Sequence, residues 1–319
     1  STSKNRMMKH ILVTGGAGFI GSNTVRYALD KGLAVSVLDS FENAVISKAD
    51  LIKLGAHVLE LDIQDSRVLE NLSGQFDAIV HLAAQVSVPK SIQDPERNYS
   101  INVSGTEHIL QYAQQNGVKR FIFASSSAVY GDCETMPLSE SSEGELQSPY
   151  AESKLEIEQQ IDACFQQGAE FLSLRFFNVY GPEQRLDSDY GAVVPIFIDR
   201  TLQGIQPRIY GSGKQSRDFV NVRDVARLLI DLSIEQWPQP NHSVYNVGTG
   251  HSVTILELAS LIHELSGSNF AFEPSFQPER AGDIEHSVAL IEAIKRDLNW
   301  KPVITLEDGL RELIEVSSS

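Results

Sequence analysis

The sequence predicts an α/β protein with a doubly wound parallel sheet, followed by a smaller C-terminal α/β domain. Short apolar runs alternate with helical patterns through the N-terminal half, which indicates a parallel sheet with helices on both faces. The apolar runs are continuous, as expected for strands that are buried on both sides. A glycine-rich turn joins the first run to the first helical pattern. These three observations carry the prediction of the fold.

The predicted elements follow one another in a regular order. Strands are expected at 10–14, 34–38, 57–61, 78–82, 120–125 and 171–176. Helices are expected at 19–31, 101–116 and 150–167, and a glycine follows each of them. After Asn178 the rhythm changes, and loops rich in Gly, Pro and charge are expected over 180–217. Further helices are expected at 222–235, 254–266 and 290–298, with a strand at 243–247.

The helix and strand expected between 222 and 247 resume the pattern of the first sheet. The second domain is therefore predicted to be discontinuous in sequence. The first domain is predicted to contain residues 7–177 and 219–250. The second is predicted to contain residues 178–218 and 251–319, and to bind the substrate.

The charge balance excludes several classes of partner. Acidic residues outnumber basic ones by 42 to 26, which gives a formal net charge of −16 and disfavours binding to nucleic acid or anionic membranes. No apolar run approaches the roughly 20 residues that span a bilayer. The two cysteines are expected to be free thiols, and we expect a cytoplasmic protein. The eight histidines show no metal-ligand spacing, so no metal is predicted.

The turn after the first strand has the spacing G-x-x-G-x-x-G, with glycines at Gly15, Gly18 and Gly21. Glycine permits both a sharp turn and the close approach of a diphosphate to the backbone. The helix that opens at Phe19 and Ile20 offers its free N–H groups to the phosphates. The turn is therefore predicted to bind a dinucleotide.

Asp39 ends the second strand about 20 residues after Gly18, where a carboxylate binds the adenosine ribose hydroxyls. A carboxylate repels a 2′-phosphate, and no Lys or Arg follows Asp39 until Lys48, so NAD is preferred over NADP. Residues at the ends of the third and fourth strands are further candidates for cofactor contacts: Asp62, Ile63, Leu82, Ala83 and Ala84.

Tyr150 and Lys154 form the pattern Y-x-x-x-K at the start of a predicted helix, so their side chains share one face. Tyrosine has an ordinary pKa of about 10, and a neighbouring ammonium stabilises its phenolate. The phenol can then accept a proton from a sugar hydroxyl. A run of three serines, 125–127, follows the fifth strand and can bond the same oxygen. Both features lie at carboxyl ends of strands, where α/β sheets bind ligands.

Eight motifs between Thr14 and Ser287 resemble one family. They read TGGAGFIG, HLAA, SSSAVYG, YAESK, RFFNVYGP, RDFVNVRD, YNVGTG and ERAGDIEHS. Through them the chain resembles the extended short-chain dehydrogenases/reductases, and among these the nucleotide-sugar 4-epimerases. The resemblance implies a Rossmann domain with NAD as cofactor and a UDP-sugar as substrate. It also implies a homodimer formed through the helices near 101–116 and 150–167.

The resemblance also implies residue roles. Ser126 matches the catalytic hydroxyl residue, with Ser125 and Ser127 as alternatives, and Tyr150 is the base with Lys154 as its partner. Asn102, Ser125, Tyr150 and Lys154 complete the predicted cofactor-contacting set. Residues predicted to contact the substrate are Ser87, Ser126, Asn178, Val193, Ile209, Tyr210, Arg217, Arg280, Asp283 and Ser287. Among these, Asn178, Arg217 and Arg280 match diphosphate contacts, and Asp283 matches a ribose contact.

The implied reaction is oxidation at C4 followed by reduction on the other face. Tyr150 removes the proton of the C4 hydroxyl while a hydride passes from C4 to NAD. The 4-keto sugar turns in the pocket and takes the hydride back on its opposite face. Related dehydratases carry an Asp–Glu pair after the catalytic hydroxyl residue. Here Ser127 and Ala128 follow Ser126, so no general acid is available for elimination.

Ser287 lies where the family limits the sugar pocket, and a small residue there leaves room for a 2-acetamido group. Ser87 and Lys90 resemble the sugar-contacting loop of N-acetylhexosamine epimerases. The sequence thus predicts interconversion of UDP-N-acetylglucosamine (UDP-GlcNAc) and UDP-N-acetylgalactosamine (UDP-GalNAc), with UDP-glucose and UDP-galactose as slower substrates. Alternatives are a UDP-glucuronate 4-epimerase and an NAD(P)-dependent 4-keto-sugar reductase. A catalytically inactive, NAD-sensing Rossmann protein is the alternative that is not an enzyme.

Overall fold

The structure is a computed structural model that describes residues 8–186 and 192–319. Met7, the predicted start of the first domain, lies outside the described residues. So do residues 187–191, which belong to the second predicted domain.

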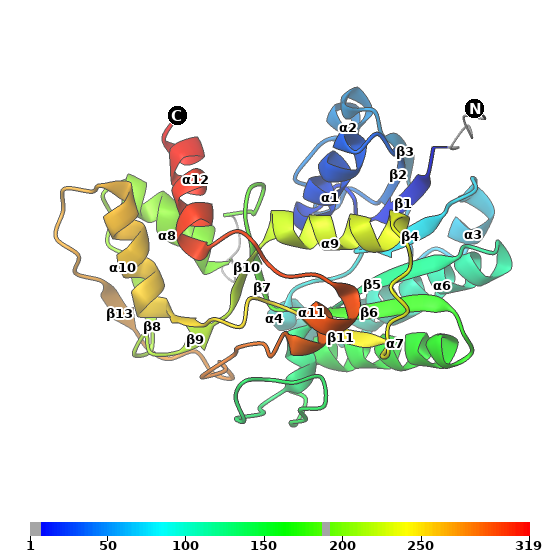
Figure 1. Ribbon diagram of the computed structural model, residues 1–319. Helices are drawn as coiled ribbons and strands as arrows, with labels where there is room; N and C mark the ends of the chain where they lie inside the picture. The colour runs from blue at the N-terminus through cyan, green and yellow to red at the C-terminus, as the bar shows by residue number, and fades with distance from the viewer. Residues whose placement is uncertain (1–7, 187–191) are drawn as a thin grey trace.

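A seven-stranded sheet forms the centre of the larger lobe of the molecule, and all of its strand pairs are parallel (Figure 1). In spatial order its strands are β11 (Val244–Val247), β6 (Glu170–Phe176), β5 (Arg120–Ser126), β4 (Ala78–His81), β1 (His10–Thr14), β2 (Ala34–Asp39) and β3 (His57–Glu60). The chain moves outward from β1 to β3, then returns to β4 beside β1 and continues the other way. Ligands bind α/β sheets at such a reversal of strand order. The predicted fold class is confirmed.

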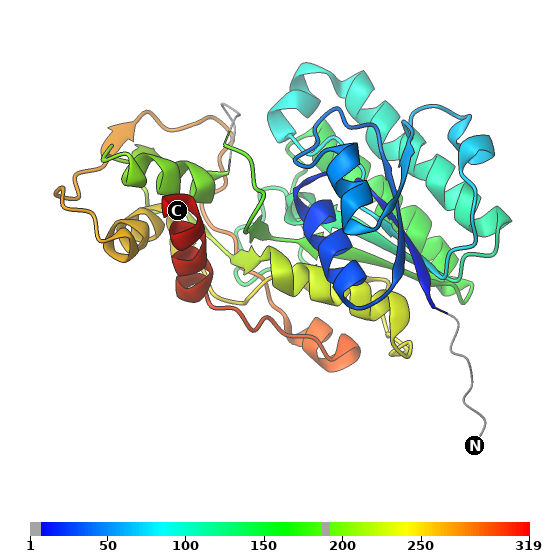
Figure 2. The ribbon, with the colours of Figure 1, turned by 90° about the horizontal axis from the view of Figure 1, so that it is seen from above.

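Two sets of helices cover the two faces of the sheet (Figure 2). One face carries α1 (Phe19–Asp30) and α9 (Val222–Ile234), and the other carries α6 (Thr106–Gln115) and α7 (Pro149–Gln166). Adjacent strand residues alternate between the two cores. Val13 belongs to the core with α1 and α9, whereas Leu12 belongs to the core with α6 and α7. Burial on both sides explains why the strands are continuously apolar.

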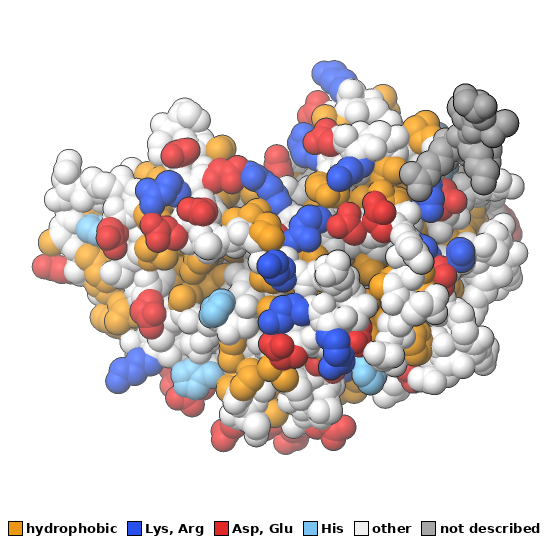
Figure 3. Space-filling model, in the orientation of Figure 1, with side chains coloured by type: hydrophobic (Ala, Val, Ile, Leu, Met, Phe, Trp, Pro, Cys, Tyr) orange, Lys and Arg blue, Asp and Glu red, His pale blue; other side chains and the backbone are white. Residues whose placement is uncertain are grey.

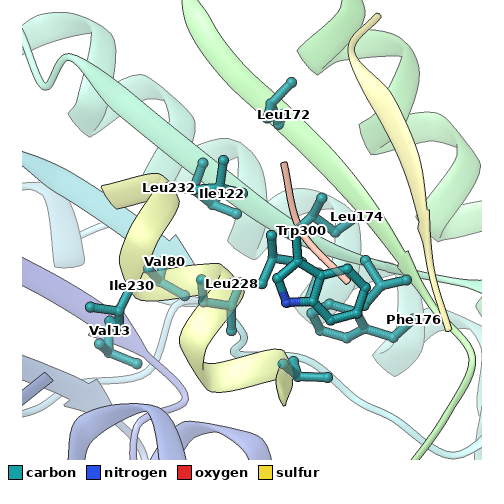
Figure 4. Close-up of a cluster of buried hydrophobic side chains, with 14 of the residues drawn as sticks. Val13, Val80, Ile122, Leu172, Leu174, Phe176, Leu228, Ile230, Leu232 and Trp300 are labelled. Carbon is teal, nitrogen blue, oxygen red and sulfur yellow. The ribbon is translucent and has the colours of Figure 1, made fainter. Parts of the chain in front are cut away.

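The core under α9 is drawn in Figure 4. Three α9 side chains, Leu228, Ile230 and Leu232, lie over strand residues. These strand residues include Val13, Val80, Ile122, Leu172, Leu174 and Phe176. Trp300 belongs to the same core, and its indole N–H donates to the backbone oxygen of Asp224 at 3.1 Å, which fixes the ring against α9. Burial of each aliphatic side chain contributes roughly 1.5–3 kcal/mol, so this face holds α9 firmly on the sheet.

The smaller lobe has a separate hydrophobic core. Its elements are α8 (Val193–Leu202), α10 (Ile255–Ser266), α12 (Leu306–Ser318), β8 (Arg208–Tyr210), β9 (Ser216–Arg217), β12 (Val253–Thr254) and β13 (Ser275–Gln277). β8 pairs with β13 and β9 pairs with β12, so segments far apart in the sequence lie side by side. The domain limits expected from the sequence stay a prediction.

Helix α8 corrects the expectation of loops throughout 180–217. Val194, Phe197, Ile198 and Thr201 are buried, which is the spacing of one helical face. Pro195 lies in the first turn, where proline costs no hydrogen bond. The glycines and prolines around this short apolar run favoured a loop interpretation, whereas packing in the smaller lobe produces a helix.

Several short elements were not expected from the sequence. They include the strands β8, β9, β12 and β13 of the smaller lobe, and also α2 (Lys48–Leu54), α3 (Val68–Asn71), α4 (Val88–Gln93), α5 (Pro95–Tyr99), a 3-10 turn (Ser127–Tyr130), β7 (Asn178–Tyr180) and β10 (Phe219–Asn221). The helix expected at 101–116 starts as a π-helical segment (Ser100–Gly105) and continues as α6. The helix expected at 290–298 is α11 (Glu292–Leu298), and its buried side chains belong to the core of the larger lobe. β7 pairs with β10 where the two lobes join (Figure 1).

Candidate active site

The glycine turn between β1 and α1 has a backbone that only glycine can form. Gly15 has φ +70°, and a Cβ there would lie 2.7 Å from the backbone nitrogen of Ala83. A Cβ at Gly21 would overlap the carbonyl oxygen of Gly15. Helix α1 starts after Gly18 without a side-chain cap, so its first N–H groups can bind an anion. The turn therefore fits the diphosphate of a dinucleotide.

Asp39 lies at the end of β2 and is tied to the same turn. Its carboxylate accepts hydrogen bonds from the backbone N–H of Ala17 at 2.9 Å and of Phe41 at 2.8 Å. Burial raises the pKa of this carboxyl above its ordinary value, and the backbone N–H groups oppose that shift. The carboxylate is half-buried and can still accept bonds from ribose hydroxyls. The turn and Asp39 together fit NAD.

Thr14 and His81 form a buried hydrogen-bonded group beside the glycine turn, and neither residue was singled out from the sequence. The Thr14 hydroxyl accepts from the N–H groups of Leu82 at 3.1 Å and Ala83 at 3.2 Å. Because the oxygen of this hydroxyl already accepts two hydrogen bonds, the hydroxyl donates to Nδ1 of His81 at 2.7 Å. Nε2 of His81 is then the protonated nitrogen, and it donates to the Thr106 hydroxyl at 2.8 Å. Burial lowers the pKa of His81 to about 3, so the ring is neutral.

Asn102 lies in the π-helical segment and fixes the backbone of the segment that follows β4. Its side chain accepts from the N–H of Gln85 at 2.8 Å and donates to the oxygen of Gln85 at 3.0 Å. Ala84 is half-buried next to this anchor. Ser87, two residues after Gln85, caps α4 by accepting from the N–H of Lys90 at 3.2 Å. The predicted contacts Leu82, Ala83, Ala84 and Ser87 are therefore held on one short segment.

The remaining predicted cofactor contacts follow β3. The exposed Asp62 accepts from the backbone N–H of Gln64 at 2.9 Å. Ile63 is buried and packs on Gly105, where a Cβ would lie 2.7 Å from the Ile63 side chain. The structure thus places Asp62 at the surface and Ile63 in the core under α6.

Ser126, Tyr150 and Lys154 come together where β5 ends and α7 begins. Ser148 caps α7, and this cap fixes the first turn, on which Tyr150 lies. Nζ of Lys154 donates to the backbone oxygen of Ala124 at 2.8 Å and lies 5.6 Å from the centroid of the Tyr150 ring. Tyr150 and Lys154 are both buried, and Ser126 is hydrogen-bonded to the Tyr150 hydroxyl.

Burial sets the protonation of this cluster. It lowers the pKa of Lys154 to about 8, and the carboxylate of Glu158 opposes that shift. Burial also raises the pKa of Tyr150, and the hydrogen bond with Ser126 opposes it. A phenol whose phenolate is stabilised by a nearby cation and a hydroxyl can exchange a proton with a substrate oxygen.

The structure also separates the three candidate serines. Ser125 is 3% exposed, and its hydroxyl donates to Glu158 at 2.5 Å, so it is already committed within the protein. Ser127 starts the 3-10 turn that follows β5. Ser126 is half-buried and bonded to Tyr150. Of the three, Ser126 has the geometry of the catalytic hydroxyl.

Predicted nucleotide-contacting residues gather in the smaller lobe. Arg217 donates to the Asp283 carboxylate at 2.8 Å and to the backbone oxygen of Ile284 at 2.6 Å. The N–H of Ser287 donates to the oxygen of Ser216 at 3.1 Å, so Ser287 lies on the segment beside Arg217. The three predicted contacts Arg217, Asp283 and Ser287 thus occupy adjacent segments.

A second group of predicted nucleotide contacts surrounds β8. The guanidinium of Arg280 stacks on the Tyr210 ring, 3.8 Å from its centroid. Val193 is half-buried at the start of α8. Ile209 is fully buried in the core of the smaller lobe, so its side chain offers no surface to a base. Asn178 is exposed at the start of β7.

Asp218 is a further residue that sequence reasoning missed. Its buried carboxylate accepts from the N–H groups of Thr249 at 2.9 Å, Gly250 at 3.0 Å and Ala289 at 3.1 Å. It thereby joins the segment of Arg217 to the YNVGTG motif and to the chain just after Ser287. An acid directly after a candidate phosphate-binding arginine was the available signal.

The family comparison agrees with this geometry. Residues 11–248 match the NAD dependent epimerase/dehydratase family, and the chain belongs to it. The chain is therefore an enzyme of an NAD-dependent epimerase family, and the predicted membership and cofactor are confirmed. Within the described residues, no helix has the length and apolar character that a membrane crossing requires.

Individual relatives cover nearly the whole chain. UDP-glucose 4-epimerase of Lacticaseibacillus casei is 33% identical and covers 96% of this chain and 95% of its own. The structure of UDP-glucose 4-epimerase from Thermotoga maritima with UDP-glucose has a TM-score of 0.87 at 34% identity, covering 96% and 97% of the two chains. UDP-N-acetylglucosamine 4-epimerase from Methanobrevibacter ruminantium M1, in complex with UDP-N-acetylmuramic acid, has the same TM-score and identity and covers 98% and 99%.

Proposed function

We propose that the protein is a UDP-sugar 4-epimerase that interconverts UDP-GlcNAc and UDP-GalNAc, and UDP-glucose and UDP-galactose more slowly. The observation that carries the proposal is the cluster of the half-buried Ser126 with the buried Tyr150 and Lys154 at the carboxyl end of β5. The glycine turn and Asp39 lie at the same edge of the sheet. The similarity to 4-epimerases along almost the full length of the chain supports the reaction type.

Each residue of the cluster has a separate task. Tyr150 takes the proton of the C4 hydroxyl and later returns it to the same oxygen. Ser126 bonds that oxygen and orients it toward the phenol. Lys154, as an ammonium, stabilises the phenolate that forms. NAD, when bound, supplies the acceptor and then the donor of the hydride at C4.

The nucleotide must stay anchored while the sugar turns between the two half-reactions. Arg217 and Arg280 are the candidates for the diphosphate, because guanidinium groups match phosphate oxygens in charge and geometry. Asp283 is the candidate for the ribose hydroxyls. In the structure Arg217 pairs with Asp283, so binding of a diphosphate exchanges one anionic partner of Arg217 for another.

The preference for acetylated sugars rests on Ser287. This residue is 6% exposed, and its backbone is bonded to the residue that precedes Arg217. A side chain of this size leaves space for a 2-acetamido group, whereas a tyrosine would fill that space. The preference is therefore a matter of volume, and the volume can be changed by a single substitution.

The test replaces Ser287 with tyrosine. We expect kcat/KM for UDP-GlcNAc to fall about a hundredfold or more, while kcat/KM for UDP-galactose stays within about threefold of the wild type. Turnover of UDP-galactose also reports that the variant is folded. The matched control is Ser260→Tyr on the exposed side of α10, which should change neither value. Persistent turnover of UDP-GlcNAc by Ser287→Tyr would refute the assignment.

A further inference from the structure

A buried ion pair lies behind the candidate catalytic cluster. Glu158 of α7 and Arg175 of β6 make three hydrogen bonds, at 2.6, 3.0 and 3.2 Å. Their side chains are 3% and 9% exposed. Buried ion pairs contribute little net stability, because desolvation offsets their attraction. The location of this pair therefore calls for a functional explanation.

The pair holds together segments that build the active site. The Ser125 hydroxyl donates to Glu158 at 2.5 Å, next to Ser126. Ser125 is also the register partner of Arg175 across β5 and β6. Arg175 donates at 3.1 Å to the backbone oxygen of Glu140, in the loop that leads into α7. A single charged contact thus ties the end of β5, the middle of α7, the strand β6 and the loop before α7 together.

Glu158 also lies one helical turn after Lys154, so the two side chains share a face of α7. Other titratable or charged groups face Lys154 or the ion pair from the neighbouring elements. Tyr150 on α7 and His81 on β4 interact with Lys154 itself. Arg175 on β6 pairs with Glu158, and its guanidinium lies over the ring of Tyr130 on the 3-10 turn. His81 is neutral, and burial raises the pKa of Tyr130 to about 12, so neither supplies a charge at neutral pH.

We propose that Glu158 is a positioning residue that keeps Lys154 protonated and aligns Ser126 with Tyr150, with Arg175 as its counter-ion. The proposal rests on the catalytic roles proposed above for Tyr150 and Lys154. Without Glu158, burial and the remaining Arg175 cation would both disfavour the ammonium form of Lys154. Without Arg175, the lone Glu158 carboxylate would favour it. The two removals therefore act in opposite directions.

The experiment measures kcat against pH for the NAD-loaded enzyme. Glu158→Gln keeps the size of the side chain and removes its charge. We expect the alkaline limb of the kcat–pH profile, where Lys154 loses its proton, to move to lower pH by about one unit. Arg175→Gln is the matched variant, and its alkaline limb should move up. The double variant Glu158→Gln/Arg175→Gln removes both charges and should return the limb close to the wild-type position. Ser125→Ala keeps both charges and should lower kcat without moving the limb.

A purely structural role would change the melting temperature and leave the alkaline limb of every folded variant in place. That result, or limbs that move the same way in Glu158→Gln and Arg175→Gln, would overturn the proposal. If Glu158→Gln does not fold, Arg175→Gln and the double variant still decide between the two cases. Tyr150→Phe tests the proposed function separately. If it retains wild-type turnover, the catalytic assignment itself fails, whatever the pH profiles show.

Discussion

At the scale of single residues, buried polar side chains organise the candidate site. The Y-x-x-x-K spacing predicts that Tyr150 and Lys154 share a helix face, and the structure places Lys154 beside the Tyr150 ring. Local spacing could not predict the partners Thr14, Glu158 and Arg175. Their contacts join strands and helices that are distant in sequence, and a buried polar side chain is identified only when its partner is known.

His81 gives a prediction about acid stability. Its pKa is about 3 in the folded protein, below the ordinary 6.5, so unfolding takes up a proton between these values. Stability should therefore fall as the pH drops through 6.5, with a slope of up to about 1.4 kcal/mol per pH unit from this group alone. Urea unfolding between pH 4.5 and 7.5 measures the slope.

Two variants separate the imidazole from its hydrogen bonds in the same measurement. His81→Gln removes the titrating group and should flatten the slope by about one proton. Thr106→Val removes the acceptor of Nε2 but keeps the ring, so it should lower stability and retain the slope. Equal slopes for the wild type and His81→Gln would contradict the assignment.

At the scale of elements, the strands of the central sheet were easier to predict than the elements of the smaller lobe. The seven strands of the central sheet were all expected, because burial on two sides gives each an apolar run. Helix α12 was not expected, and α8 was interpreted as part of a loop. The apolar faces of α8 and α12 pack on each other and on α10 in the core of the smaller lobe. Local periodicity in the sequence does not reveal this packing.

The glycine turn provides the prediction at this scale. Gly21→Ala adds a Cβ that overlaps the carbonyl oxygen of Gly15, so the turn must open and the diphosphate site is lost. We expect the purified variant to carry less than about a tenth of the wild-type NAD content, measured on the cofactor released by denaturation. Gly204→Ala is the control. It strains a residue with φ +73° after α8 and should leave the NAD content unchanged.

At the scale of the whole molecule, the two lobes carry different parts of the candidate site. The larger lobe carries the glycine turn and the Ser126–Tyr150–Lys154 cluster, and the smaller lobe carries Arg217 and Ser287. The Asp218 carboxylate links segments of the two lobes by accepting hydrogen bonds from the N–H groups of Thr249 and Ala289. Acidic and basic side chains are interspersed over the face in Figure 3. The homodimer and the cytoplasmic location stay predictions.

We propose that bound NAD is regenerated in every cycle, so that turnover needs no added cofactor. The direct measurement incubates protein purified without added NAD with UDP-GlcNAc and separates the products. We expect bound NAD in the purified protein, a UDP-GalNAc peak and no net absorbance change from NADH, with no product from Tyr150→Phe. An NAD-containing protein that forms no UDP-GalNAc, or forms product only while consuming added NADH, would contradict the account.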